Sequence, residues 1–281
     1  MNILGIDFED WYHPELIKKV LSNEKKEPKI INGLDAILDW LRKKEILATF
    51  FVVGELIEFK PEILDKILEN DHEIAFHTMT HTRLHEMTKE SLNEELKQFA
   101  RITNNKSKGF RAPTFSLDSK TSWAINCLEE NNYLYDSSIV PVKTSMYGIS
   151  NSEIKPYKIS DNLISHNEQG KILEFPLSVT KFLGKKLPAC GGFYLRTLPL
   201  KIIKKTIQNY EQMDYPAVFY IHSWELTPQY MPKIKLSTKD SFVTYHNLHK
   251  AMNKMNELVS NFQFTSFENI LRNNDFRNYF A

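Results

Sequence analysis

Eight short apolar runs, separated by amphipathic segments, constrain the fold of this chain more than any other feature. The runs are too short for helices, are rich in Ile, Val, Phe and Tyr, and occupy residues 2–7, 48–53, 73–77, 109–115, 133–137, 172–177, 217–222 and 262–267. Their apolar residues are mostly continuous, as in strands that are buried on both faces of a parallel sheet.

The segments between the runs have helical spacing, for example Gly33 to Lys44 and Leu200 to Met213. Strand and helix alternating along a chain predict a parallel α/β fold. The 281 residues suit one closed or nearly closed barrel, since such domains reach about 250 residues. We therefore expect a single domain over 1–281, with an irregular inserted loop at about 139–170 and a C-terminal extension at about 229–281.

Charge and hydropathy exclude several partners. Lys plus Arg total 36 and Asp plus Glu total 35, so no basic footprint for nucleic acid is present. No apolar stretch is long enough to span a membrane, and the first residues lack the basic and apolar regions of a signal peptide. We expect a cytoplasmic protein with two reduced cysteines, and the oligomeric state stays open.

Polar residues stand where the apolar runs end. Asp7, His77, Asp136 and His222 each close or directly follow a run core, and Arg111 follows Gly-Phe. The carboxyl ends of parallel strands converge on one rim of an α/β barrel, where its active site lies. These residues are therefore expected to meet despite their separation in sequence.

The pattern His-Thr-Met-Thr-His indicates a metal site. His77 and His81 stand four residues apart, a spacing that places two imidazoles on one face of a helical turn. The acidic cluster of Asp7, Glu9 and Asp10 can supply a carboxylate. One carboxylate and two imidazoles leave positions open for water and substrate, which suits Zn²⁺ or another first-row divalent ion.

Five segments then carry a family resemblance, and they occur in this order: Asp7-Phe8-Glu9-Asp10-Trp11, His77 to His81, Arg111-Ala112-Pro113-Thr114-Phe115, Tyr135-Asp136-Ser137-Ser138 and Val218-Phe219-Tyr220-Ile221-His222. Together they resemble the motifs of the NodB-like polysaccharide deacetylases of carbohydrate esterase family 4. Gly191-Gly192-Phe193-Tyr194 and His222-Ser223-Trp224-Glu225 are similar to the exopolysaccharide-associated branch of that family.

The resemblance implies a distorted (β/α)7 barrel of the NodB type, a divalent metal and hydrolysis of an N-acetyl group on a sugar or polysaccharide. Zinc is the expected metal, with cobalt, nickel, iron and manganese as alternatives. A carbohydrate is the expected partner.

The resemblance also implies roles for individual residues. Asp10, His77 and His81 are the expected metal ligands, with Asp7 or Glu9 as the base. Many members have two adjacent aspartates, which would map onto Glu9 as the base and Asp10 as the ligand. Some members instead use an Asp-x-Asp spacing, so a second mapping, in which Asp7 is the base and Glu9 the ligand, stays open.

The remaining roles complete the expected site. Arg111 would orient the base, and His222 would protonate the leaving amine. The residues expected to contact substrate, or to support those that do, are Trp11, Thr114, Asp136, Tyr194 and Trp224. For Thr114 the expected contact is its backbone N–H, and Asp136 could instead orient His222 or cap a turn.

Three other functions compete with this interpretation. An allantoinase-like amidase would act on a small cyclic amide from the same strand ends. A barrel that binds sugar without catalysis would fit the altered acidic cluster. A metal-independent glycoside hydrolase would use a carboxylate pair such as Asp7 and Glu174 across a cleft.

Overall fold

The main sheet is a curled, largely parallel sheet, in a computed structural model that describes residues 1–21, 26–182 and 184–273. Its strand order is β10-β1-β2-β3-β4-β5-β7-β6, and β11 pairs with the start of β1. The strands of this sheet are β1 (Asn2–Phe8), β2 (Thr49–Val52), β3 (Glu73–Phe76), β4 (Gly109–Phe110), β5 (Tyr135–Asp136), β6 (Tyr157–Ile159), β7 (Ile172–Glu174), β10 (Val218–His222) and β11 (Phe264–Thr265). Among the described strands of this sheet, β6 alone runs antiparallel to its neighbour.

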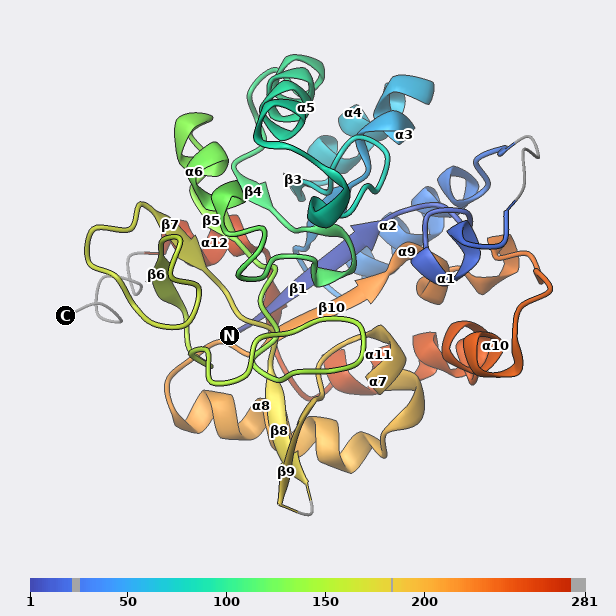
Figure 1. Ribbon diagram of the computed structural model, residues 1–281. Helices are drawn as coiled ribbons and strands as arrows, with labels where there is room; N and C mark the ends of the chain where they lie inside the picture. The colour runs from blue at the N-terminus through green and yellow to red at the C-terminus, as the bar shows by residue number, and fades with distance from the viewer. Residues whose placement is uncertain (22–25, 183, 274–281) are drawn as a thin grey trace.

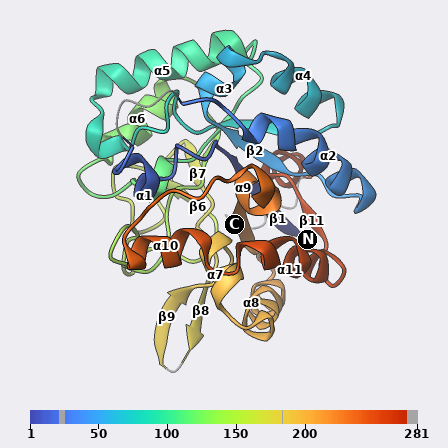
Figure 2. The same ribbon diagram turned by 90° about the vertical axis from the view of Figure 1, so that its right-hand side faces the viewer.

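Helices surround this sheet (Figures 1 and 2). Their bounds are α1 (Glu15–Lys18), α2 (Leu34–Lys43), α3 (Gly54–Phe59), α4 (Glu62–Glu69), α5 (Lys89–Ile102), α6 (Trp123–Glu130), α7 (Gly192–Thr197), α8 (Leu200–Gln212), α9 (Ser223–Leu226), α10 (Thr238–Tyr245), α11 (Ala251–Val259) and α12 (Phe267–Arg272). The apolar stripes expected at 33–44 and 200–213 become α2 and α8, because burial of those stripes against the sheet stabilises both helices.

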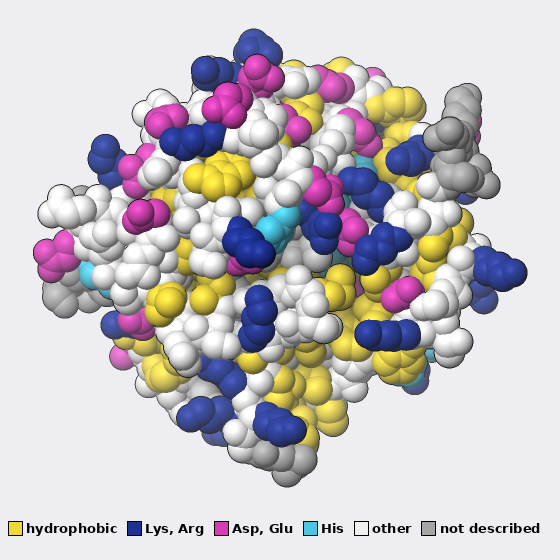
Figure 3. Space-filling model, in the orientation of Figure 1, with side chains coloured by type: hydrophobic (Ala, Val, Ile, Leu, Met, Phe, Trp, Pro, Cys, Tyr) yellow, Lys and Arg dark blue, Asp and Glu magenta, His cyan; other side chains and the backbone are white. Residues whose placement is uncertain are grey.

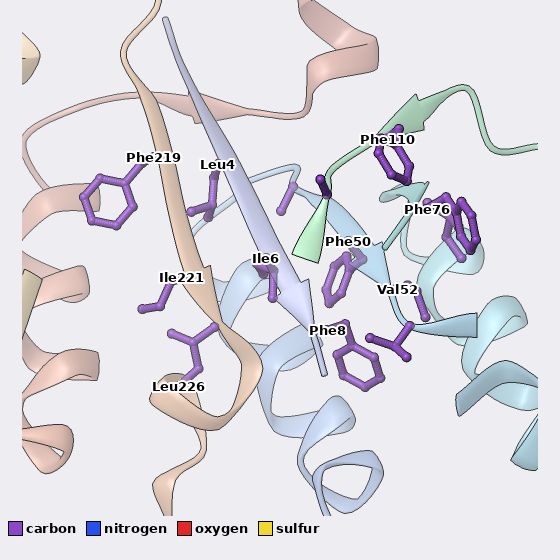
Figure 4. Close-up of a cluster of buried hydrophobic side chains, with 14 of the residues drawn as sticks. Leu4, Ile6, Phe8, Phe50, Val52, Phe76, Phe110, Phe219, Ile221 and Leu226 are labelled. Carbon is purple, nitrogen blue, oxygen red and sulfur yellow. The ribbon is translucent and has the colours of Figure 1, made fainter. Parts of the chain in front are cut away.

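Side chains alternate between the two faces of the sheet. Figure 4 shows Leu4, Ile6 and Phe8 of β1 in the outer layer, between the sheet and the helices. The intervening residues face the barrel interior, where Ile3 belongs to a separate apolar cluster. A Cβ on Gly5 would lie 2.8 Å from the Arg111 guanidinium, so the close approach of that side chain requires glycine here.

Seven parallel strands, from β10 through β1 to β5 and β7, confirm the predicted distorted (β/α)7 barrel. The ring stays open between β7 and β10, where the chain after β7 contacts β10 through backbone and side-chain hydrogen bonds of Ser178 with Val218. The eighth apolar run differs from expectation. Only Phe264–Thr265 is strand, and it pairs with Asn2 and Ile3 outside the ring.

The inserted loop and the segment after β7 contain regular structure that the sequence did not predict. The loop at 139–170 contributes β6, which lies antiparallel to β7. A separate hairpin follows, formed by β8 (Val179–Phe182) and β9 (Lys185–Pro188). Within the described ranges, no helix combines the length and the apolar character needed to cross a bilayer.

Candidate active site

Glu9, His77 and His81 form a buried cluster at the carboxyl ends of β1 and β3. One potential ligand atom from each residue lies within 4.8 Å of the others. Glu9 Oε2 is 2.7 Å from His81 Nε2, yet this carboxylate oxygen has no hydrogen bond of acceptable geometry. A carboxylate oxygen and an imidazole nitrogen that lie this close without forming a hydrogen bond are expected when both atoms point toward a shared cation.

Neighbouring groups orient the three side chains as a ligand set. His77 Nδ1 lies 2.7 Å from the Arg111 carbonyl oxygen, which directs the other ring nitrogen toward the cluster. Trp224 Nε1 donates to Glu9 Oε1 at 2.8 Å. His81 Nδ1 is buried without a hydrogen-bond partner. The residues therefore fit a divalent metal, because unpaired buried polar atoms are costly unless something binds them.

Charge and burial favour the protonation states that metal binding needs. Burial lowers the pKa of His77 to about 4, so its imidazole is neutral. Burial alone would raise the pKa of Glu9, but the imidazole of His81 and, after it, two further histidines hold that pKa far below its usual range. Glu9 is therefore ionised.

The backbone between the two histidines is not the helical turn that their spacing predicted. The segment after β3 is a loop, and Thr78 and His81 have left-handed φ values of 58° and 55°. The rings still meet, with centroids 4.9 Å apart. Left-handed non-glycine residues cost roughly 1 kcal/mol or more, so surrounding contacts such as Thr82 N–H to Thr78 Oγ1 must hold this loop.

Asp10 does not occupy the ligand position predicted for it, which Glu9 takes instead. The Asp10 carboxylate accepts hydrogen bonds from the backbone N–H groups of Trp11, Lys29 and Ile30, at 2.7–2.8 Å. Burial raises the pKa of this carboxyl to about 6, although these donors lower it. Asp10 therefore fixes the loop after β1, and the mapping with Glu9 as ligand and Asp7 as base matches the geometry.

Asp7 and Arg111 form an ion pair inside the barrel. Arg111 Nη1 donates to Asp7 Oδ1 at 2.6 Å, and the arginine is fully buried. Its other donors bind the Ser137 carbonyl and hydroxyl oxygens at 3.0 and 2.9 Å. The guanidinium carbon also lies 3.9 Å from the centroid of the Phe51 ring. These contacts hold Asp7 in one orientation at the cavity wall.

His222 is oriented by Glu225 rather than by Asp136. Glu225 Oε2 lies 2.8 Å from His222 Nδ1 and accepts the His222 backbone N–H at 3.1 Å. Arg196 donates to the other Glu225 oxygen, and a Cβ on Gly192 would lie 1.9 Å from Glu225 Oε2. Burial alone would lower the pKa of His222, but Glu225 and then other carboxylates raise it to about 9.

Sequence reasoning missed Glu225 and Arg196 as functional residues. Glu225 belongs to the His-Ser-Trp-Glu segment, three residues after His222. This spacing at the start of a helix could have indicated the contact, since the side chain of the third helical residue can hydrogen-bond to the residue that caps the helix N-terminus. Arg196 had no comparable signal, because its partnership with Glu225 depends on the packing of α7 against β10.

Asp136 faces away from the site because of strand alternation. It pairs in register with Phe110 of β4 and Glu174 of β7, and Phe110 belongs to the outer layer. Asp136 accepts from Ser138 Oγ at 2.5 Å, and Glu174 accepts from the Ile139 N–H at 2.9 Å. Neither lines the cavity, so the structure contradicts substrate contact by Asp136 and the paired carboxylates Asp7 and Glu174.

Asp136 and Glu174 instead form a buried acid pair. Burial raises the pKa of Glu174 well above its usual range, and the neighbouring Asp136 raises it further. Burial also raises the pKa of Asp136. The pair is therefore expected to keep a proton to a higher pH than exposed carboxyls do, since two adjacent buried carboxylates cannot both ionise cheaply.

Replacing Glu174 with glutamine is expected to flatten the pH dependence of stability. A raised folded-state pKa stabilises the protein fully below the unfolded value of about 4.3, and this contribution is lost as pH rises toward the folded value. Between pH 5 and 8 the wild-type free energy of unfolding should fall more steeply than that of Glu174→Gln, by up to about 1.4 kcal/mol per pH unit. Urea denaturation at pH 5 and at pH 8 measures the free energy of unfolding of each variant.

Glu168→Gln, a change at an exposed carboxylate in the inserted loop, is the control and should keep the wild-type slope. Parallel profiles for wild type and Glu174→Gln would contradict the raised pKa of Glu174.

A cavity of about 240 Å³ opens above the metal-binding cluster. Of the predicted site residues, Asp7, Glu9, His77, His81, Thr114, Tyr194, His222 and Trp224 line it. The cavity wall also includes Glu15, Leu16, Thr144 to Tyr147, Phe193, Val243 and Thr244. The inserted loop and the C-terminal region thus shape the cavity.

Trp11 was expected to contact substrate, and the structure contradicts this. Its side chain is buried in the outer apolar layer, and Nε1 donates to the Glu27 carbonyl at 3.0 Å. Trp224 lines the cavity, but its indole N–H is used by Glu9. Its ring stacks on His222 with centroids 4.6 Å apart.

Two family models match parts of the chain. Residues 31–132 match the family model described as polysaccharide deacetylase. This part of the chain is therefore similar to polysaccharide deacetylases. Residues 137–272 match a second family model, described as a domain of unknown function (DUF3473). The family resemblance drawn from the five motifs is therefore confirmed.

Curated relatives share short segments with this chain. Chitin deacetylase 1 of Cryptococcus neoformans var. grubii is 38% identical over 60 residues, covering 21% of this chain and 13% of that protein. A chitooligosaccharide deacetylase of Bradyrhizobium sp. is 35% identical over 60 residues, covering 21% and 27%. The matches therefore span less than a third of these relatives.

Solved structures share the fold at low sequence identity. A putative polysaccharide deacetylase from Mycobacterium smegmatis has a TM-score of 0.60 at 16% identity, covering 96% of this chain and 88% of that one. Puue allantoinase has a TM-score of 0.54 at 12% identity, covering 93% and 86%. Because a deacetylase and an allantoinase both resemble this fold, the fold alone does not separate the two activities.

Proposed function

We propose that this protein is a metal-dependent hydrolase that removes N-acetyl groups from an N-acetylated sugar or polysaccharide. The observation that carries the proposal is the cluster of Glu9, His77 and His81, flanked at the same cavity by Asp7 and His222. A ligand set, a base and an acid around one small cavity are what hydrolysis of an amide needs.

Glu9, His77 and His81 would hold the cation, with zinc as our first choice from the mixed carboxylate and imidazole ligands. A divalent metal supplies Lewis acidity toward a carbonyl and lowers the pKa of water. Asp7 lies beside this cluster in the cavity wall and accepts the proton of the attacking water. Arg111 keeps the Asp7 carboxylate oriented through the 2.6 Å contact to Oδ1, which leaves Oδ2 for the water.

His222 donates the proton that the leaving amine requires. Because Nδ1 is engaged by Glu225, Nε2 is the ring nitrogen available to substrate. His222 Nε2 lies 3.7 Å from Glu9 Oε1, so the proposed proton donor is next to the residues that would hold the metal. Amide nitrogen is a poor leaving group unless it is protonated, so this transfer is essential for an acetamido substrate.

Thr114 and the aromatic wall are suited to the rest of the substrate. Thr114 has a left-handed φ of 54° and lines the cavity, and its N–H is our candidate donor to the developing oxyanion. Tyr147, Phe193 and Tyr194 form an aromatic wall. Flat aromatic faces with hydroxyl groups can stack on a sugar ring and bind its hydroxyls.

Acetate release tests the proposal. Purified protein with Zn²⁺ or Co²⁺ is expected to release acetate from N-acetylhexosamine oligomers, and chelation should abolish the release until metal is restored. Enzymatic acetate detection across a panel of acetylated sugars, with allantoin as the cyclic amide, provides the measurement. Ring opening of allantoin without acetate release would favour the amidase, and bound metal without any hydrolysis would favour a binding barrel.

A further inference from the structure

The β8–β9 hairpin and α8 form a basic surface, which we define by Lys181, Lys185 and Lys186 of the hairpin and Lys201 and Lys205 of α8. Between Glu174 and Glu211 the sequence has no Asp or Glu, but six lysines and one arginine. In a chain with nearly equal numbers of basic and acidic residues, this segment is a strong local imbalance.

The two elements lie side by side at one end of the molecule in both ribbon views (Figures 1 and 2). The Tyr210 hydroxyl of α8 accepts the Val179 N–H of β8 at 3.1 Å, which joins them directly. On the face drawn in Figure 3, Lys and Arg side chains lie beside hydrophobic ones at this lower end, and acidic side chains are absent there. The lysines therefore act as one surface.

Most of the six lysines between Glu174 and Glu211 do not form ion pairs within the described part of the protein. Lys204 of α8 pairs with Glu257 at 2.8 Å, whereas across the described part of the chain the five lysines of the basic surface have no ion-pair partner. In the hairpin, Lys181 stands directly opposite Lys186. Like charges in opposite positions destabilise a two-stranded ribbon, so this arrangement carries a cost that an anionic partner would relieve.

An apolar side chain accompanies the charge. Phe182 ends β8 opposite Lys185 and is 44% exposed. The hairpin projects from the body of the molecule (Figure 2), and no heavy atom lies within 4 Å of a Cβ built on Gly184. A convex tip with an exposed aromatic residue suits a flat, partly apolar partner, whereas soluble ligands bind in concave sites.

We propose that this surface docks the protein onto an anionic lipid bilayer. The lysines would contact lipid phosphates, and the Phe182 ring would enter the interface between headgroups and acyl chains. Basic residues near a negatively charged leaflet and aromatic residues at its interface are the two contributions that bind peripheral proteins reversibly.

Vesicle binding tests the proposal with the whole protein. Wild type is expected to bind vesicles of phosphatidylcholine with phosphatidylglycerol, to leave pure phosphatidylcholine vesicles unbound, and to dissociate as salt rises. Each lysine near an anionic bilayer contributes roughly fivefold to the affinity. The triple change Lys181→Gln, Lys185→Gln, Lys186→Gln should therefore weaken binding on the order of a hundredfold, measured by sedimentation with vesicles.

Matched variants separate this surface from charge and hydrophobicity in general. The control Lys233→Gln, Lys235→Gln, Lys239→Gln removes equal charge from exposed lysines elsewhere and should bind like wild type. Phe182→Ser should weaken binding about tenfold, whereas Phe59→Ser, at the 64% exposed Phe59, should not. Equal losses in the test and control triples would overturn the proposal. Binding to heparin without binding to anionic vesicles would overturn it as well, and would assign the surface to acidic polysaccharide.

Discussion

Replacing Glu9 with glutamine is expected to remove metal binding and acetate release together. Glutamine keeps the size of the side chain and can still accept the Trp224 N–H, but it lacks the negative charge that the cation needs. Loss of a group that merely supports a ligand already weakens metal binding about 10–100-fold, so loss of a ligand should weaken it more. Metal content after dialysis and acetate release from an N-acetylhexosamine oligomer measure the two effects.

Asp10→Asn is the matched control, because Asp10 is the neighbouring carboxylate that the family pattern favoured as ligand. The asparagine should leave metal content near wild type. It should lower the free energy of unfolding by about 1–3 kcal/mol, because its amide leaves one of the three backbone N–H donors unsatisfied. Loss of metal in Asp10→Asn, with full metal content in Glu9→Gln, would reverse our assignment of the ligand.

Replacing His222 with asparagine is expected to lower the rate of amide hydrolysis by a factor of about 10²–10⁴, with little change for an activated aryl acetate. An aryloxide leaves without protonation, whereas the amine of an acetamido sugar does not. Metal content should stay at the wild-type level, since His222 is outside the ligand cluster. The ratio of kcat/KM for the amide to kcat/KM for the ester isolates the proton transfer.

Glu225→Gln extends this test to the group that orients the acid. It should lower the same ratio in the same direction, because Glu225 holds Nδ1 and leaves Nε2 facing the cavity. Asp136→Asn changes a carboxyl on the opposite face of the sheet and should leave the ratio unchanged. Equal losses on amide and ester in His222→Asn would show that this histidine has no specific role in protonating the amine.

Strand alternation explains which assignments from the sequence agree with the structure. In a strand, residues two positions apart face the same side of the sheet. Interior-facing positions at Gly5, Ala75, Gly109 and Tyr220 are each followed, two residues later, by Asp7, His77, Arg111 and His222, respectively. Glu9 stands two residues after Asp7 and keeps the same alternation, whereas Asp10 and Asp136 have the opposite alternation. Application of this period-two rule to the strand ends would have rejected Asp10 and Asp136 from the sequence alone, and it would have left both Asp7 and Glu9 as candidate ligands.

Other parts of the site had no local pattern to predict them. The left-handed residues Thr78 and His81 place two imidazoles together in a loop, although their spacing predicted a helical turn. The Trp11 indole is buried in the outer layer because the loop after Asp10 folds back over it. Both outcomes depend on contacts between distant segments, so propensity and spacing could not reveal them.

The barrel class, the identity of most reactive side chains and the rim on which they meet follow from the amino-acid sequence. These depend on hydrophobic periodicity and on the direction of parallel strands, which are local properties repeated along the chain. Only the tertiary structure decided which carboxylate joins the two histidines, that Glu225 orients His222, and that residues 144–147 and 243–244 enclose the cavity. Those outcomes depend on distances of a few ångströms between side chains far apart in sequence, and only packing of the whole chain sets such distances.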